Sequence, residues 1–228
     1  MKKIYIELID GSKSVNMVQV LEEGQKKEKL ISIEDFVTSI TASLDGKNFE
    51  EVKSPIFRDL RGVRLIQSKQ VGKNSHTYVL FQAKHNTPFQ LFNRFYENVG
   101  VPNLLYGVKV VNNRLSKLYV VAIKDTNIVG STKLYKYPFT NVSGNLGSAC
   151  LGRNVFDVGI EDNDLEKLYS IPNQFMSMPN NLDYYRIQNN NKCYECEQLL
   201  KVLNNNIFDN DLLVENDIMT YANWFNQL

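Results

Sequence analysis

Residues 104–124 read LLYGVKVVNNRLSKLYVVAIK, and this stretch decides the class of fold. Two apolar runs flank Asn112 and Asn113, which are typical turn residues, so the stretch predicts a β-hairpin. Two similar runs come earlier in the chain, with a second turn at residues 72–74. The four extended segments are Val63–Gln67, Thr77–Ala83, Leu104–Val111 and Lys117–Lys124. Together they predict an antiparallel meander.

The N-terminal region predicts a hairpin and a helix. Lys3–Leu8 and Met17–Leu21 are β-like runs separated by the turn-forming residues 10–14. After Ser32, apolar residues follow the spacing i, i+3, i+4, i+7, so we expect a helix from about residue 33 to residue 44. The segment Pro88–Asn98 is compatible with either a short helix or the end of a strand.

Two apolar stripes near the C-terminus predict helices. The first comprises Leu199, Leu200, Leu203 and Ile207, and the second comprises Leu212, Ile218, Met219, Ala222 and Phe225. A meander with flanking helices is an α+β architecture and differs from a doubly wound fold. We therefore expect an N-terminal hairpin and helix extension at residues 1–70 and the main domain at residues 71–228.

Composition and charge exclude several classes of protein. The 228 residues are 43% hydrophobic and 22% charged, which is too apolar for a disordered chain. The net charge is +1, so neither a nucleic acid nor a membrane surface is expected as a partner. The first apolar run is short and is broken by Glu7. We therefore expect no export signal and a cytoplasmic location.

Cysteine and histidine usage limits the possible chemistry. Three cysteines, an odd number, predict free thiols and no disulfide framework. His76 and His85 are the two histidines, so a metal site has few possible ligands. No nucleotide-binding or zinc-protease motif is present, and we expect neither a metal nor a cofactor. Cys193 and Cys196 form a lone C-x-x-C pair, and Cys196 continues the first apolar stripe, which predicts a core role for it.

One cysteine lies in a segment that could carry chemistry. Ser131–Phe156 is long and has little periodicity, and such loops are often functional. Cys150 lies in it between small residues, which would let a bulky acyl group approach the sulfur. Arg153 would favour the thiolate if it folded toward the sulfur. Cys150 has two alternative roles. It could be a small buried core residue, or it could form a hydrolytic dyad with one of the histidines.

The same segment resembles a known family. Pro138-Phe139-Thr140-Asn141-Val142, followed by Gly147 and by Cys150-Leu151-Gly152, is similar to the active-site segment of the ubiquitin-conjugating (UBC) superfamily. The closer resemblance is to a bacterial branch, prokaryotic ubiquitin-conjugating family D, also known as PRTRC system protein B. Leu118-Tyr119-Val120 and Phe175-Met176-Ser177 are similar to two further elements of that branch, so the resemblance covers roughly residues 100–180.

The chain departs from the superfamily at two points. Tyr137 stands where ubiquitin-conjugating enzymes have histidine, and two residues separate Pro138 from Asn141. The bacterial branch resembles this chain in that altered spacing. The resemblance therefore points to the branch more closely than to the eukaryotic enzymes, and it leaves the geometry of Asn141 open.

The resemblance implies a UBC-like fold and a cofactor-free thioester transfer. Cys150 would accept a ubiquitin-like modifier from a ThiF-like activating enzyme and pass it to a target amine. Asn141 would either stabilise the oxyanion of each transfer step or pin its own loop by hydrogen bonds. The alternative is a catalytically inactive UBC-like binding module in a plasmid or mobile-element system of the PRTRC type. The oligomeric state is not predicted by these residues.

Overall fold

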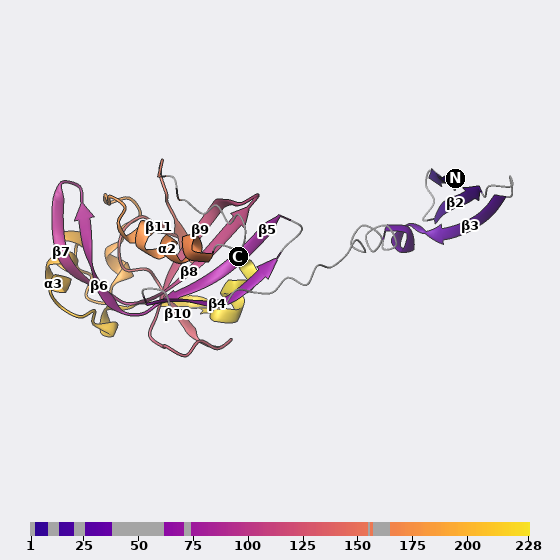
Figure 1. Cartoon of the computed structure of the whole chain (residues 1–228). Coiled ribbons are helices and arrows are strands. Elements are labelled where there is room, and N and C mark those ends of the chain that lie inside the picture. The colour runs from indigo at the N-terminus through magenta and orange to yellow at the C-terminus, as the bar shows by residue number, and fades with distance from the viewer. Residues whose placement is uncertain are drawn as a thin grey trace. The chain divides into compact units, whose positions relative to one another are not determined.

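The structure is a computed structural model that describes residues 3–8, 14–20, 26–37, 62–70, 74–154, 156 and 165–228. The chain forms two compact units, Met1–Lys53 and Ser54–Leu228. In the first unit, three antiparallel strands lie in chain order (Figure 1): β1 (Lys3–Leu8), β2 (Ser14–Val20) and β3 (Lys26–Ser32). The predicted hairpin is confirmed, because β1 pairs with β2.

The third strand and the start of the predicted helix follow that hairpin. β3 was not predicted, since its first four residues are charged and show no apolar alternation. Residues 33–37 are helical, and the hydroxyl oxygen of Ser32 accepts a hydrogen bond of 2.9 Å from the Asp35 N–H. That contact caps the helix at the predicted start. The remainder of the predicted helix, residues 38–44, lies outside the described residues.

The second unit is built on an eight-stranded antiparallel sheet, and the predicted meander forms its centre. β11, β12, β9, β8, β5 and β4 lie side by side in that order, while β10 pairs with β9 and with β13. The strand bounds are β4 (Val63–Gln70), β5 (Ser75–Gln82), β8 (Asn103–Val111), β9 (Arg114–Ile123), β10 (Lys133–Tyr135), β11 (Val142–Ser143), β12 (Ser148–Ala149) and β13 (Glu215–Thr220). These pairings confirm the α+β class with an antiparallel meander.

The boundary between the two units differs from the expected one. The expectation placed residues 1–70 in the N-terminal extension, which would include β4. In the structure β4 pairs with β5 over its length, and Val63 at its start is fully buried in the core of the second unit. The backbone of β4 therefore pairs within the main sheet, and Val63 packs in the core of the second unit. The division between the two units falls between Lys53 and Ser54.

The segment Pro88–Asn98, whose sequence fits either a short helix or the end of a strand, lies in a second hairpin. β6 (His85–Leu91) and β7 (Arg94–Val101) pair as a separate two-stranded sheet between β5 and β8 in the chain. The register shifts between Thr87 and Phe89. Pro88 lies at this irregularity, and it has no N–H to donate to a regular ladder.

Two hydrophobic clusters cover the two faces of the main sheet. Leu104 and Val120 belong to the first cluster, whereas their neighbours Leu105 and Val121 belong to the second. This alternation follows from the two-residue period of a strand. Residues of α2 and α3 complete the first cluster, and residues of α4 complete the second. The helices are α2 (Leu165–Met176), α3 (Cys196–Leu203) and α4 (Tyr221–Gln227), with short 3₁₀ turns η1 (Ile187–Asn189) and η2 (Asn210–Leu212).

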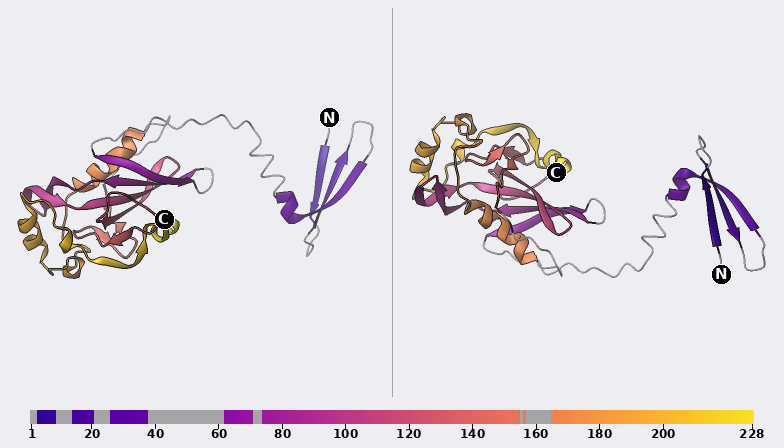
Figure 2. Two further views of the ribbon diagram at one scale, coloured as in Figure 1. Left: turned by 90° about the horizontal axis from the view of Figure 1, so that it is seen from below. Right: turned by 90° about the horizontal axis from the view of Figure 1, so that it is seen from above.

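The predicted C-terminal helices are confirmed only in part. The first stripe forms α3 and is buried, except that Ile207 lies beyond the helix and is 76% exposed. The second stripe is split, because Glu215–Thr220 forms β13 and the helix begins only after Thr220, whose hydroxyl accepts from the Asn223 N–H. α3 packs on β7, and Lys69 of β4 donates to the Phe225 carbonyl of α4. Figures 1 and 2 show α3 and α4 at opposite ends of this unit.

Candidate functional site

Cys150 lies at the exit of a short hairpin. β11 and β12 pair at Val142 with Ala149 and at Ser143 with Ser148, and Cys150 is the next residue. The Cys150 N–H donates to the Asn141 carbonyl oxygen over 2.7 Å, so this bond continues the hairpin by one pair. The Cys150 thiol is exposed. The alternative of a buried core cysteine at this position is therefore wrong.

The hairpin is held against the main sheet from two sides. The Val120 N–H of β9 donates to the Gly147 carbonyl oxygen over 2.7 Å, and the Trp224 indole of α4 donates to the Leu146 carbonyl oxygen over 2.9 Å. Gly147 has a φ of +75°, and a Cβ atom there would lie 2.1 Å from the Val120 oxygen. Glycine is therefore required at this position, both for its conformation and for the close approach of the two backbones.

Asn141 is buried under this hairpin, and its side-chain nitrogen donates to two protein oxygens. It is 8% exposed and has a φ of 63°. Its amide nitrogen donates to the Asn180 side-chain oxygen over 2.9 Å and more weakly to the Pro179 carbonyl oxygen over 3.4 Å. An amide NH₂ group has two donors, so both are directed at protein oxygens. In this conformation the geometry is that of loop support, the second of the two expected roles.

Asn180 is the residue that sequence reasoning missed. Its side-chain oxygen also accepts from the Thr140 hydroxyl over 2.6 Å, and its own amide donates to the Met178 carbonyl oxygen over 2.9 Å. Its backbone bonds to Gln90 and Phe92 of the β6–β7 hairpin. Asn180 thus ties the turn before Cys150 to a second hairpin. In the sequence it is one asparagine among many, and no local pattern marks it.

The other two cysteines differ in their surroundings. Cys196 is 2% exposed in α3, and the predicted core role is confirmed. Burial raises the pKa of its thiol to about 12, and the nearby Glu197 and Glu195 add to the rise. Cys193 is exposed. At neutral pH the exposed thiols should therefore be far more reactive than Cys196.

The histidines do not assemble a hydrolytic dyad with Cys150 in the described part of the chain. His85 lies within 2.8 Å of the Ala83 carbonyl oxygen, and burial lowers its pKa against the opposing effect of that contact. His76 stacks on Tyr78 with 6.0 Å between the ring centroids. Among the residues that the structure describes, no hydrogen bond or ion pair joins Arg153 to the Cys150 sulfur either. The expected help from Arg153 is therefore not seen in this conformation.

No group of three or more histidine, cysteine or acidic side chains is arranged to hold a metal ion within the described residues. None of the helices described has the length and apolar character that crossing a bilayer requires.

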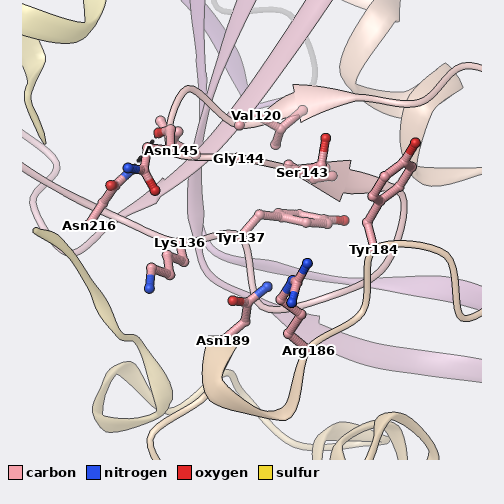
Figure 3. Close-up of a pocket in the computed structure, with 13 residues that line it drawn as sticks. Val120, Lys136, Tyr137, Ser143, Gly144, Asn145, Tyr184, Arg186, Asn189 and Asn216 are labelled. Carbon is pink, nitrogen blue, oxygen red and sulfur yellow. Dashed lines mark hydrogen bonds between the residues drawn. The ribbon is translucent and has the colours of Figure 1, made fainter.

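A polar pocket lies beside the Cys150 hairpin. It has a volume of about 170 Å³ and is lined by strand β9, the β11–β12 hairpin, the segment around Tyr184 and strand β13. Figure 3 shows Tyr137 in the middle of the lining residues, with Asn216 and Lys136 toward one end and Tyr184 toward the other. Tyr137 is the residue that the resemblance aligns with the histidine of ubiquitin-conjugating enzymes. It is 5% exposed and its hydroxyl lies 3.6 Å from the Met176 sulfur, so it belongs to the core as well as to the pocket wall.

Comparison with known proteins gave one finding. The family model of prokaryotic E2 family D matches residues 59–216. The match includes the Cys150 hairpin, Asn180 and the main sheet up to the first residues of β13. It leaves out the three-stranded sheet of the first unit. Searches of the curated proteins and of the solved structures found no match.

Proposed function

Because this chain belongs to prokaryotic E2 family D, we propose that it carries a ubiquitin-like modifier as a thioester on Cys150 and passes it to a target amine. One observation supports this most directly. The thiol is exposed at the end of a hairpin whose backbone is fixed by hydrogen bonds from Val120, Trp224 and Cys150 itself. A covalent carrier needs both features, since its sulfur has to be accessible and has to stay in one place.

The proposed reaction has two acyl transfers. In the first, the Cys150 thiolate attacks the carbonyl carbon of a thioester on the activating enzyme. A new C–S bond forms, the old C–S bond breaks, and the cysteine of the activating enzyme leaves as a thiolate. In the second, a target amine attacks the same carbonyl carbon, the C–N bond forms, Cys150 leaves as a thiolate and the amine proton passes to solvent. Splitting the acylation in this way needs no cofactor.

Asn141 acts in this proposal as a positioning residue. Its amide is bonded to Asn180 and Pro179, so it holds the turn whose carbonyl oxygen accepts from the Cys150 N–H. The oxyanion role would require its amide to leave Asn180. The two roles predict different mutant behaviour. If Asn141 only positions the loop, Asn180→Ala should slow the transfer at least as much as Asn141→Ala, because it breaks the same bond and also the bond from Thr140.

The proposed partners are a ThiF-like activating enzyme and a ubiquitin-like modifier protein. We propose the cytoplasm as the place of reaction, because thioester transfer needs cysteines that stay reduced. The test is a charging assay with a ThiF-like activating enzyme and a ubiquitin-like modifier, followed on non-reducing gels. We expect an adduct that a thiol reductant removes. Cys150→Ser should give a reductant-resistant ester, and Cys150→Ala should give no adduct.

Cys193→Ser is the matched control, because Cys193 is also exposed. It should charge like the wild type. An adduct that persists in Cys150→Ala and disappears in Cys193→Ser would refute the assignment of the carrier. An intact, folded protein that takes up no modifier at all would favour the second candidate.

The second candidate is a catalytically inactive UBC-like binding module of a PRTRC-type mobile-element system. One observation favours it, namely that the Asn141 amide faces Asn180. A module of this kind would keep the fold and the hairpin but would not need an accessible donor for an oxyanion. It would bind the same partners without forming the reductant-sensitive adduct.

A further inference from the structure

An exposed apolar patch lies on two neighbouring segments beside the Cys150 hairpin, and the two acyl transfers do not use it. Its members are Phe92, Leu182 and Tyr184, which are 52%, 52% and 49% exposed. A hydrogen bond joins the two segments, because the Phe92 N–H donates to the Asn180 carbonyl oxygen over 2.8 Å. Exposed apolar side chains on adjoining segments are typical of a binding surface.

The backbone is strained at two of these residues. Phe92 has a φ of 51° and Tyr184 has a φ of 61°, in the left-handed region that bulky residues rarely adopt. Glycine adopts this conformation without that steric cost, so folding alone would favour glycine at both positions. Strain of this kind persists mainly at functional sites. The two aromatic rings are therefore better explained by binding than by folding.

Hydrogen bonds connect the patch to Cys150. The Asn141 N–H donates to the Asp183 carbonyl oxygen over 3.1 Å, and the Cys150 N–H donates to the Asn141 carbonyl oxygen over 2.7 Å. The three backbones are thus neighbours in one row, and at about 4.8 Å per step Cys150 lies roughly 10 Å from the backbone beside Tyr184. Figure 3 shows Tyr184 at the open end of the Cys150 hairpin, away from Asn145 in its turn.

We propose that the apolar patch receives the C-terminal segment of the modifier and selects an apolar residue at the third or fourth position from its end. This inference rests on the proposed function. A segment that is joined to the Cys150 sulfur through its terminal carbonyl group is tethered beside the patch. An extended chain advances about 3.3 Å per residue, so about three residues span the distance from Cys150 to the patch. The tether is what favours the modifier over other occupants of this surface.

The test uses peptide thioesters, which acylate Cys150 without an activating enzyme. Each probe is an acetylated octapeptide of glycine and serine that ends in a glycine thioester of mercaptoethanesulfonate. A single leucine stands at either the fourth or the eighth position from that end, so the two isomers have the same composition. The Cys150 thiolate attacks the thioester carbonyl carbon, a new C–S bond forms, and mercaptoethanesulfonate leaves as a thiolate.

The full chain carries Cys193→Ser in this assay, which leaves Cys150 as the exposed cysteine. Intact mass then gives the second-order rate of acylation at peptide concentrations well below saturation. We expect the isomer with leucine at the fourth position to react about fivefold faster, as partial burial of one leucine side chain predicts.

Variants test the patch. Tyr184→Gly and Phe92→Gly each remove a ring and relieve a left-handed backbone, so both should fold, and each should reduce the fivefold preference to about twofold or less. Leu182→Ser should have the same effect. Asn113→Gly is the matched control, because it makes a glycine change at a φ of 58° in the β8–β9 turn, and it should keep the full preference.

The outcomes separate this inference from the proposed function. Acylation of Cys150 at equal rates by the two isomers, or a preference that survives in all three patch variants, would overturn the inference alone. A folded protein in which no peptide acylates Cys150 would overturn the proposed function and this inference with it.

Discussion

Gly147→Ala tests how strictly the Cys150 hairpin is held against the main sheet. The added Cβ would lie 2.1 Å from the Val120 oxygen and 2.9 Å from its carbonyl carbon. A carbon atom normally stays about 3.3 Å from a carbonyl oxygen, so the hairpin has to retreat by about 1 Å. The hydrogen bond of 2.7 Å from the Val120 N–H to the Gly147 oxygen would then be lost.

The expected loss of stability has two parts. An alanine at φ +75° costs about 1–2 kcal/mol because of its left-handed backbone. Displacing packed backbone, including the lost bond, costs about 1–3 kcal/mol more. The sum is about 2–5 kcal/mol. With a urea dependence of about 2 kcal/mol per molar, the midpoint of unfolding should fall by about 1–2.5 M.

Gly144→Ala is the matched control. Gly144 has a φ of +69°, close to that of Gly147, but a Cβ there meets no atom within 4 Å. Only the backbone cost of about 1–2 kcal/mol applies, so its midpoint should fall by about 0.5–1 M. Urea unfolding can be followed through the fluorescence of Trp224, which is the single tryptophan and contacts the hairpin directly. Equal losses in the two variants would refute the close approach of the hairpin to β9.

Three further outcomes follow from the same contacts. Trp224→Phe removes the donor to the Leu146 carbonyl and should cost about 1–3 kcal/mol in urea unfolding followed by circular dichroism; no change would mean that the bond contributes nothing. A brief pulse of iodoacetamide at pH 7 should label Cys150 and Cys193 in the folded protein, and Cys196 only after unfolding, as read by intact and peptide mass. The pKa of the Cys196 thiol is about 12 in the folded protein, against an ordinary value of 9.0. The unfolded chain therefore loses this proton first, and the free energy of unfolding should fall as the pH rises from 9 toward 12. Cys196→Ala should show a smaller fall over this range, and a steeper fall in the variant would contradict the burial of the thiol.

The sheet was largely predictable because its signal is local. β4, β5, β8 and β9 are runs of apolar residues bounded by turn residues, and each run carries its own evidence of extended structure. β13 was not predictable in this way. Its partner β10 lies about 80 residues earlier in the chain, and a pairing over that distance leaves no mark on either segment. The apolar spacing near β13 also fits a helix, and the sheet partner overrides it.

α2 was missed for a related reason. It contains Pro172 and an asparagine, which disfavour a helix in isolation. Its stability comes from Leu168, Ile171 and Phe175, which are buried in the first cluster. Tertiary packing of an apolar face outweighs weak local propensity here, as it does for most short helices.

The candidate site shows the same division between local and distant signals. Cys150 and the turn at Asn141 are close in sequence and could be named from one motif. The partner that decides what Asn141 does is Asn180, 39 residues away. Neither residue's side chain carries a pattern that would predict the bond. The hydrogen bond that favours loop support over oxyanion stabilisation is therefore visible only in the structure.

The shared oxygen of Asn180 also has an evolutionary consequence. It accepts from both Thr140 and Asn141, so the three side chains form one hydrogen-bonded cluster in which the residues at the three positions depend on one another. Replacing Asn180 by an apolar residue leaves both buried donors without this acceptor, whereas losing one donor still leaves the shared oxygen paired with the other, so position 180 should tolerate change least. Serine for Thr140 keeps the hydroxyl donor to this oxygen, whereas aspartate for Asn180 loses the donor to the Met178 carbonyl oxygen and places a second oxygen against it. A hydrophobic residue at position 180 should appear only where positions 140 and 141 have lost their donors as well.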